Sequence, residues 1–359
     1  MDSSSSPRVT LAQVAERAGV STMTASYTFS RPERVSDASR EKVLSAAKVL
    51  GYAGPDPSAR SLRRGKAGAL GVVFGEHLTY AFDDPQATAF LAGVAEVCAE
   101  QGQAMTILPV TDATADAGRI GAAAVDGYVL WTTEDGAPVV DSVIATGRPV
   151  VVHSGPAAPG AQVVGIDNRA AARAIGRLLF AGATVPVVLS FPLTGARTAG
   201  VFTGPDPHGA TFPVTRERLL GFRDAATDEG IDWADVLVAV CSTNDAREAQ
   251  TMTTDLISRA RRPDAIAAMS DELAAGALRA LDATGLHVPA EVALTGWDDA
   301  DAARTLGITT VAQSMREQGA ACARQALTGS DTDFSDQWKI IERTSTHVHA
   351  QYTCDADLE

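Results

Sequence analysis

A short segment near the start of the chain carries polar side chains suited to contacts with nucleic acid. If the residues after Ser21 form a helix, its outward positions are Thr22, Met23, Ser26 and Tyr27. Side chains of these types suit contacts with base edges and phosphates when a helix enters the major groove of DNA. This face is therefore a candidate for sequence-specific DNA binding.

Two predicted helices position that face. Thr10 is placed to N-cap a first helix that ends at Gly19, and Ser21 is placed to cap the second helix two residues later. The first helix has apolar residues at i, i+3, i+4 and i+7: Leu11, Val14, Ala15 and Ala18. Two helices this close, with small Ala15 and Ala25 at their crossing, predict a helix-turn-helix.

A third helix is predicted between a cap at Ser36 and a stop at Gly51, with Val43, Ala46, Ala47 and Leu50 packing back on the first two. The alternative is a small three-helix bundle with no nucleic-acid role. The turn chemistry and the exposed polar face favour DNA binding. The expected DNA contacts in this part are Thr10, Ser21, Thr22, Met23, Thr24, Ser26 and Tyr27.

The next segment, residues 54–66, has the composition of a linker that folds on a partner. It holds two prolines, then enough residues for one or two helical turns, then a basic cluster. It is too short and too polar to have a core of its own, so we expect it to become a short helix only when docked on DNA.

Four stretches of this region resemble the lactose-repressor (LacI/GalR) family of bacterial transcription regulators: Val9–Tyr27, Arg34–Ser36, Gly51–Tyr52 and Ala59–Leu62. The resemblance implies double-stranded operator DNA as partner and paired hinge helices in the minor groove. Leu62 would then wedge between the central base pairs and kink the operator, at a cost of a few kcal/mol in unstacking. The hinge contacts implied are Ser58, Ala59, Arg60 and Leu62.

The charge of the chain is distributed unevenly. Its 359 residues have a formal net charge of −14, which alone argues against nucleic acid. Residues 1–66 hold 11 Lys and Arg against 6 Asp and Glu, a net of +5, and the remainder holds 19 against 38, a net of −19. The basic segment coincides with the predicted helix-turn-helix, so the acidic body does not exclude DNA binding.

The four cysteines, Cys98, Cys241, Cys322 and Cys354, are far apart and form no CxxC pair, so no metal, redox site or cofactor is expected. The N-terminus lacks the apolar region of a signal peptide, and no apolar run has the length of a membrane span. We therefore expect a cytoplasmic protein.

From residue 69 the pattern alternates between apolar strands and Ala-rich helices. The first series of strands is Ala69–Phe74, Ala104–Leu108, Gly127–Trp131 and Pro149–His153. The second is Val185–Ser190, Val236–Val240, Ala265–Met269 and Val292–Thr295. Strands of this kind predict two doubly wound α/β lobes with ligands at the carboxyl ends of the strands, which places the binding cleft between the lobes.

The resemblance implies the same architecture, an all-α helix-turn-helix headpiece followed by an α/β periplasmic-binding-protein-like core. The expected domains are the headpiece at 8–53, the hinge at 54–66 and the core at 67–350. With chain crossings near Gly165, Thr310 and Gly329, the N-terminal lobe would be 67–165 plus 311–329. The C-terminal lobe would be 166–310 plus 330–350.

Two charged residues are the first candidates for the cleft. Asp298 follows a predicted strand, and Arg218 lies in a segment similar to the family's R-x-x-G-[FW] motif. The resemblance implies effector contacts at both positions, where a guanidinium and a carboxylate would fix sugar hydroxyls or a nucleobase edge. The alternative is a surface or capping charge in each case.

Four further positions are weaker candidates for effector contact. Asp271 is expected to cap the following helix, with Ser270 either at the ligand or beside it. His153 and Gln313 follow strands and match cleft positions of the family, although a structural role is equally compatible with their sequence context. Phe82 supplies either an apolar platform or a buried loop anchor.

The chain departs from the family pattern at three places. Tyr27 replaces an arginine of the founding member and the Thr22-Met23 pair also differs, so the operator sequence cannot be transferred. Residues 191–213 form a longer loop than usual, either a lid or solvent-exposed slack.

Two other classes of function are alternatives to a DNA-binding regulator. An enzyme is disfavoured because GxGxxG, GxxxxGK[ST], HExxH and GxSxG motifs are absent from the sequence. A solute-binding protein without a specific DNA role shares the clamp but does not explain the headpiece. A two-fold operator requires two subunits, and the tail at 345–359 lacks an apolar heptad, so we expect a homodimer.

Overall fold

The computed structural model of the chain describes residues 9–54, 66–75 and 80–346. The chain divides into two compact units, Met1–Gly68 and Ala69–Glu359. The predicted hinge residues Ser58, Ala59, Arg60 and Leu62 lie outside the described residues, as do residues 347–359 of the tail.

The first unit contains the three predicted helices, α1 (Leu11–Ala18), α2 (Thr22–Ser30) and α3 (Asp37–Leu50), with a 3-10 turn at Pro32–Arg34. Their caps are the expected ones: Thr10, Ser21 and Ser36 accept hydrogen bonds from the first turns. Gly19 and Gly51 end α1 and α3 in the left-handed conformation that glycine tolerates. The core of this unit consists of Val14, Ala15, Ala25, Val43, Ala46 and Ala47.

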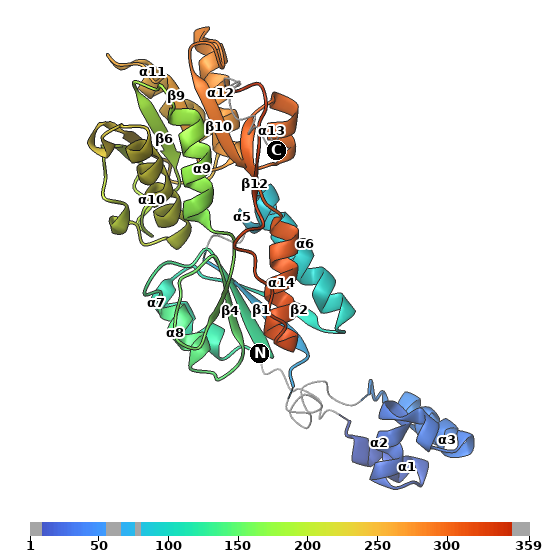
Figure 1. Ribbon diagram of the computed structural model, residues 1–359. Helices are drawn as coiled ribbons and strands as arrows, with labels where there is room; N and C mark the ends of the chain where they lie inside the picture. Colours follow the sequence, from blue (N-terminus) through green and yellow to red (C-terminus); the bar gives the residue numbers. More distant parts are fainter. Residues whose placement is uncertain (1–8, 55–65, 76–79, 347–359) are drawn as a thin grey trace, which may run out of the picture. The chain divides into compact units, whose positions relative to one another are not determined.

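The second unit begins with a parallel five-stranded sheet in the order β2-β1-β3-β4-β5. Its strands are β1 (Ala69–Phe74), β2 (Ala104–Pro109), β3 (Gly127–Trp131), β4 (Val150–His153) and β5 (Gln162–Val164). Its helices are α5 (Tyr80–Asp83), α6 (Pro85–Glu100), α7 (Ala113–Gly121) and α8 (Pro138–Ile144). Helices α6 and α14 (Met315–Thr328) cover one face, and α7 and α8 cover the other (Figure 1). We call this the N-terminal lobe.

The C-terminal lobe is built on a seven-stranded sheet in the order β12-β11-β10-β9-β6-β8-β7. Its strands are β6 (Pro186–Ser190), β7 (Gly200–Thr203), β8 (Leu237–Val240), β9 (Ala265–Ala268), β10 (Ala293–Asp298), β11 (Thr309–Ala312) and β12 (Lys339–Ile341). Only the outer strands β7 and β12 pair antiparallel. Its helices are α9 (Asn168–Phe180), α10 (Pro213–Asp228), α11 (Ala246–Ile257), α12 (Asp271–Thr284) and α13 (Asp301–Leu306), with 3-10 turns at Pro207–Gly209 and Trp233–Asp235.

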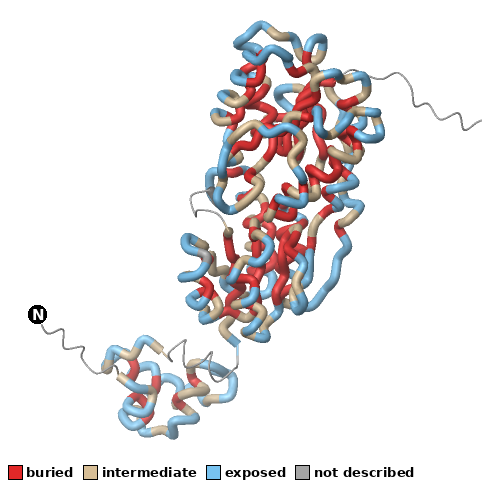
Figure 2. Tube along the Cα trace, turned by 90° about the vertical axis from the view of Figure 1, so that its left-hand side faces the viewer, coloured by how far each residue is buried: buried red, intermediate tan, exposed pale blue. Residues whose placement is uncertain are grey.

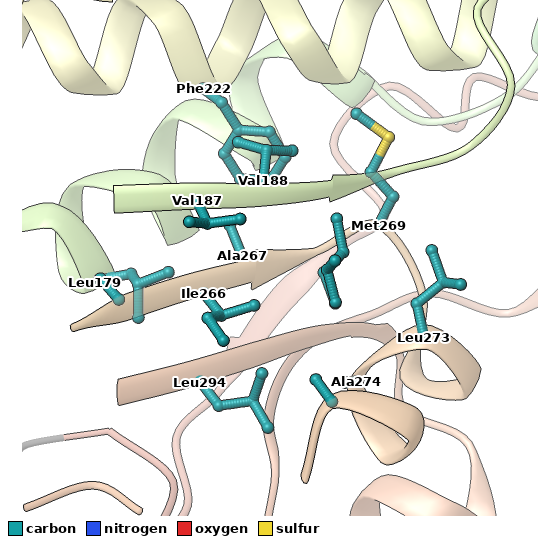
Figure 3. Close-up of a cluster of buried hydrophobic side chains, with 14 of the residues drawn as sticks. Leu179, Val187, Val188, Phe222, Ile266, Ala267, Met269, Leu273, Ala274 and Leu294 are labelled. Atoms are coloured by element: carbon teal, nitrogen blue, oxygen red, sulfur yellow. The ribbon is translucent and has the colours of Figure 1, made fainter. Parts of the chain in front are cut away.

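Each lobe has its own buried core between sheet and helices (Figure 2). In the C-terminal lobe, Val187, Ile266 and Leu294 from neighbouring strands pack in one layer (Figure 3). Residues on both faces of these strands are buried, which explains why the strands are continuous apolar runs in the sequence. The predicted headpiece and α/β core are therefore confirmed as the fold class.

Two sequence-based expectations need correction. The chain leaves the C-terminal lobe after Ala312 rather than near Thr310, because residues 309–312 form β11 and pair with β10. The long segment 191–213 is not slack, since it contains the edge strand β7 and a 3-10 turn. The Gly and Pro residues of this segment hide the strand pattern. Strand β7 is only four residues long and pairs with one neighbour, the antiparallel strand β8.

Candidate functional site

The exposed face of α2 is the first candidate surface. Met23 is 64% exposed, Thr22 is exposed, and Ser26 and Tyr27 are half-buried. Ser21 accepts the Thr24 backbone N–H at 3.0 Å and pairs with the Thr24 hydroxyl at 2.8 Å, so both hydroxyls are engaged in the cap. Thr10 is likewise part of a capping box with Gln13. These caps fix the start of α2 and leave the four outward side chains available for DNA.

A cavity of about 130 Å³ lies between the two lobes of the core. The residues around it come from both lobes, mostly from the carboxyl ends of strands and the loops that follow them, as expected for parallel sheets. The N-terminal lobe supplies Asp84, Gln86, Trp131, Thr132, Thr133, His153, Ser154 and Gly155, with Met315 on α14. The C-terminal lobe and its crossover supply Phe191, Pro192, Arg197, Phe212, Pro213, Val214, Arg218, Thr243, Asn244, Asp298 and Gln313.

Arg218 on α10 forms the charged floor of this cavity. It is buried, its Nε donates to Asn168 Oδ1 at 2.9 Å, and one terminal nitrogen donates to the Met269 carbonyl. Its guanidinium lies 3.9 Å from the centre of the Trp297 ring, a close cation–π contact. Burial lowers the pKa of Arg218 to about 10, which leaves the group charged at neutral pH.

Asp298 ends β10 and is the acidic residue whose electrostatic effect reaches Arg218. Its φ of 107° is unusual for a residue with a side chain and marks local strain at the site. Burial raises the pKa of Asp298 well above its ordinary value, while the charge of Arg218 and a 2.8 Å hydrogen bond from Gln313 Nε2 oppose that rise. Arg218 is buried, Asp298 is partly buried, and both line the cavity, so they can form hydrogen bonds with polar groups of a ligand.

His153 stands on the opposite wall, at the end of β4. It is buried against the rings of Phe90 and Trp131, and its Nε2 lies 2.9 Å from Gln318 Oε1. Burial lowers the pKa of His153, the hydrogen bond to Gln318 opposes this, and the charge of Arg218 adds to the lowering; the resulting pKa is about 4. The ring is therefore neutral at physiological pH.

A polar chain connects the two lobes on one side of the cavity. Asp84 caps α6 through Oδ1, and its Oδ2 accepts a hydrogen bond from Asn244 Nδ2 at 2.8 Å. Asn244 Oδ1 in turn accepts from the Ser270 hydroxyl at 2.6 Å. Because Asp84 belongs to the N-terminal lobe and Asn244 to the C-terminal lobe, these hydrogen bonds link the two lobes beside the cavity.

A second connection uses the long segment that precedes α10. Glu134 Oε2 accepts from Gly195 N at 3.0 Å and from the Thr211 hydroxyl at 2.7 Å. Asp135 N donates to the Thr211 carbonyl at 2.8 Å, and the Asp135 carboxylate pairs with Arg216. A Cβ on Gly195 would lie 2.4 Å from Glu134 Oε1, so a larger residue there would displace the Glu134 carboxylate from this position. We call residues 193–213 the strap, because they fasten the C-terminal lobe to the loop after β3.

The structure brings together four of the six expected effector contacts: His153, Arg218, Asp298 and Gln313 line the cavity. Ser270 does not line it, because its hydroxyl is the N-cap of α12 and binds Asn244. Asp271, expected to be the cap, instead accepts from Ala300 N at 2.7 Å and the Thr310 hydroxyl at 2.8 Å. Phe82 is 63% exposed and outside the residues that line the cavity, so it is neither platform nor buried anchor here.

Sequence reasoning missed several residues of the site. Asp84 had a detectable signal, a carboxylate directly before Pro85 at the start of a helix. Asn244 follows the strand β8 and was detectable as a strand-end residue. The aromatic lining of Trp131 and Phe191, and the role of Gln318, had no such signal, because tertiary packing decides them.

No described helix is both long and apolar enough to cross a membrane. The described part of the chain likewise holds no cluster of three or more His, Cys, Asp or Glu side chains arranged for a metal ion.

A helix-turn-helix headpiece joined to a two-lobed core with an interlobe cavity defines a ligand-responsive DNA-binding protein. Comparison with known proteins agrees. Residues 10–54 match the lacI family of bacterial regulatory proteins, and residues 193–346 match the periplasmic binding protein-like domain. An HTH-type transcriptional regulator of Mycobacterium tuberculosis is 38% identical over 317 residues, 87% of this chain and 88% of that protein. The chain therefore belongs to the LacI family of DNA-binding transcriptional regulators.

Two other relatives match nearly the whole chain. The HTH-type transcriptional regulator IpsA of Corynebacterium glutamicum is 33% identical, covering 94% of this chain and 96% of that protein. A solved structure of the transcriptional regulator CelR in complex with cellobiose superposes with a TM-score of 0.64 at 26% identity, covering 94% of this chain and all of that one.

Proposed function

We propose that this regulator is a cytoplasmic homodimeric repressor whose affinity for a near-palindromic operator is set by a small polyhydroxylated ligand in the interlobe cavity. The observation that carries the proposal is that buried Arg218 and partly buried Asp298 line one cavity, whose walls come from both lobes. A ligand that bridges these walls stabilises one relative position of the lobes, and only such a differential interaction shifts a conformational equilibrium.

DNA contacts are assigned to the outward face of α2. Thr22, Met23 and Ser26 would contact base edges, and Tyr27 would contact the backbone or a base nearby. Thr10, Ser21 and Thr24 are assigned to phosphate contacts because they lie at the helix starts, where phosphates bind. The hinge residues Ser58, Ala59, Arg60 and Leu62 are proposed to complete the interface, with Leu62 as the wedge.

The cavity favours a neutral ligand with one ring. Its volume of about 130 Å³ is close to the volume of an engineered cavity of about 150 Å³ that holds benzene. A cavity of this size is too small for a disaccharide in this arrangement of the lobes. Charged and amide groups at Arg218, Asp298 and Gln313 suit hydroxyl groups, and Trp131 and Phe191 supply apolar walls. A pentose, a hexose or a ring of similar size satisfies all these requirements. The relative CelR has been solved with cellobiose, which supports a sugar as the ligand class.

The ligand class is tested by thermal denaturation of the full chain with D-ribose, D-glucose, D-galactose, cellobiose and adenosine. A single-ring sugar at 100 times its Kd adds about 2.7 kcal/mol of stability, so a binder raises the melting temperature clearly. Cellobiose and adenosine should have smaller effects. A larger shift with adenosine than with every sugar contradicts the assignment.

The DNA function is tested by fluorescence anisotropy with DNA from upstream of the protein's own gene. A scrambled duplex is the control, since regulators of this kind often act on neighbouring genes. Equal affinity for both duplexes would favour the second candidate, a ligand sensor of solute-binding type without a specific DNA role. The observation that favours the sensor is the net charge of −19 outside residues 1–66. The proposal assigns no enzymatic activity to the chain.

A further inference from the structure

Four side chains form one continuous hydrogen-bonded relay from one lobe to the other. Gln313 Nε2 donates to Asp298 Oδ1 at 2.8 Å, and Gln318 Nε2 donates to Gln313 Oε1 at 3.0 Å. Gln318 Oε1 lies 2.9 Å from His153 Nε2. The relay runs from β10 of the C-terminal lobe, through the crossover and α14, to β4 of the N-terminal lobe.

The amide groups set the direction of the relay. Gln313 presents its NH₂ group to Asp298 and its carbonyl to the NH₂ group of Gln318. An amide oxygen only accepts hydrogen bonds and an amide NH₂ only donates them, so the orientation of one glutamine fixes that of the next. By the same logic Gln318 presents its carbonyl to His153.

The last bond in the relay fixes the tautomer of the histidine. A carbonyl oxygen only accepts, so the His153 nitrogen that faces Gln318 must carry the proton. A neutral imidazole has one N–H, which leaves Nδ1 bare. Nδ1 is buried and has no hydrogen-bond partner among the described residues, although the ring lines the cavity.

We infer that Gln318 is a positioning residue that holds His153 in the Nε2–H tautomer and so leaves its buried Nδ1 as a hydrogen-bond acceptor on a ring that lines the cavity. Gln318 is 1% exposed and does not itself line the cavity, so it acts through His153 and Gln313. The inference rests on the proposed function and narrows the ligand. A ligand group that reaches Nδ1 must offer an O–H or N–H, and a carboxylate or ketone oxygen is rejected there because two acceptors would face each other.

The test uses the full chain labelled with ¹⁵N-histidine, without any ligand. The sequence holds six histidines, and the spectrum of His153→Gln identifies the signals of His153 by their loss. Long-range ¹H–¹⁵N spectra at neutral pH distinguish the two tautomers. We expect a single Nε2–H form in the wild-type protein. An Nδ1–H form would mean that the relay runs the other way, with the proton on Asp298, and would overturn the inference.

Three variants separate positioning from mere packing. Gln318→Leu removes the acceptor and should leave His153 as a mixture of tautomers. Gln318→Glu retains an acceptor, so it should restore the Nε2–H form and shift the titration of His153 to higher pH. The matched control is Gln325→Leu, since Gln325 is also buried on α14 but bonds to Asp331, away from the relay.

The outcomes are distinct from those of the ligand screen. A pure Nε2–H form that survives in Gln318→Leu would show that Gln318 does not set the tautomer. If Gln318→Leu does not fold, loss of the Nε2–H form in Gln318→Glu would overturn the inference equally. Failure of every sugar to bind would refute the proposed ligand class and would leave the tautomer result standing.

Discussion

At the scale of single residues, the interlobe cavity is lined by the buried guanidinium of Arg218 and the partly buried carboxyl group of Asp298. Asp298→Asn keeps the shape of the side chain and removes its ionisable oxygen. Hydrogen bonds to charged groups contribute about 1.5–3 kcal/mol each, so we expect roughly a tenfold to hundredfold loss of sugar affinity by calorimetry. Operator affinity without ligand should be unchanged. Asp301→Asn is the control, because that carboxylate is exposed on α13 and should have no effect on sugar affinity.

The neutral His153 predicts a specific dependence of stability on pH. Its pKa is about 4 in the folded state and about 6.5 when unfolded, so the unfolded chain binds the extra proton between these values. The free energy of unfolding is therefore unaffected by the titration of His153 above pH 6.5 and decreases as the pH falls to about 4. The difference between the two pKa values corresponds to a loss of up to about 3 kcal/mol.

His153→Gln isolates this effect. Denaturant unfolding of both proteins between pH 7 and pH 4 should show the wild type losing stability relative to the variant as pH falls. Subtracting the variant matters because Asp271, with its pKa raised to about 6 by burial, changes stability in the opposite sense below that pH. Parallel curves for the two proteins would contradict a neutral buried His153.

At the scale of elements, the strap is held to the loop after β3 by the Glu134 carboxylate. Glu134→Ala removes the acceptor of Gly195 N and of the Thr211 hydroxyl. We expect faster hydrogen exchange at amides of residues 193–213, while β8 stays protected by the sheet. Asp141→Ala, on the exposed face of α8 in the same lobe, should leave exchange in the strap unchanged. Equal exchange in Glu134→Ala and wild type would show that the strap is held by other contacts.

Helix α2 makes a second prediction at this scale. Met23→Ala should weaken operator binding and relax its sequence preference, by about 1–3 kcal/mol for a position that contacts a base pair. The melting temperature should not change, because Met23 is 64% exposed. Val49→Ala on α3 is the matched control, an apolar side chain that is 62% exposed. Equal losses of affinity in the two variants would indicate that α2 is not the element that contacts bases.

At the scale of the whole molecule, the charge asymmetry and the two-fold nature of an operator predict the assembly. Light scattering should give a homodimer, and operator affinity should fall steeply with salt as phosphate contacts release counterions. Operators with one half-site deleted should bind far more weakly. A tetramer in solution, or affinity that is independent of salt, would contradict this prediction.

The sequence by itself determined the headpiece, because local chemistry decides it. Capping hydroxyls at Thr10, Ser21 and Ser36, and the stops at Gly19 and Gly51, are interactions between neighbours in the chain. The eight core strands were also predictable, since strands buried on both faces are continuous apolar runs. The sequence also indicated two residues of the cleft. Arg218 lies in a segment similar to a family motif, and Asp298 follows a predicted strand.

Tertiary structure alone decided what depends on partners far apart in the chain. The strands β5, β7, β11 and β12 are short edge or crossover strands of three or four residues, and their pairing is not visible in their own composition. Ser270 caps α12 in place of Asp271, and Asp271 bonds to Thr310 instead, because Asn244 and Thr310 are distant in sequence and only the fold brings these partners close. In the relay from Asp298 to His153, the hydrogen-bonded residues Gln318 and His153 are 165 positions apart in the sequence. Only the packing of the two lobes brings these side chains together.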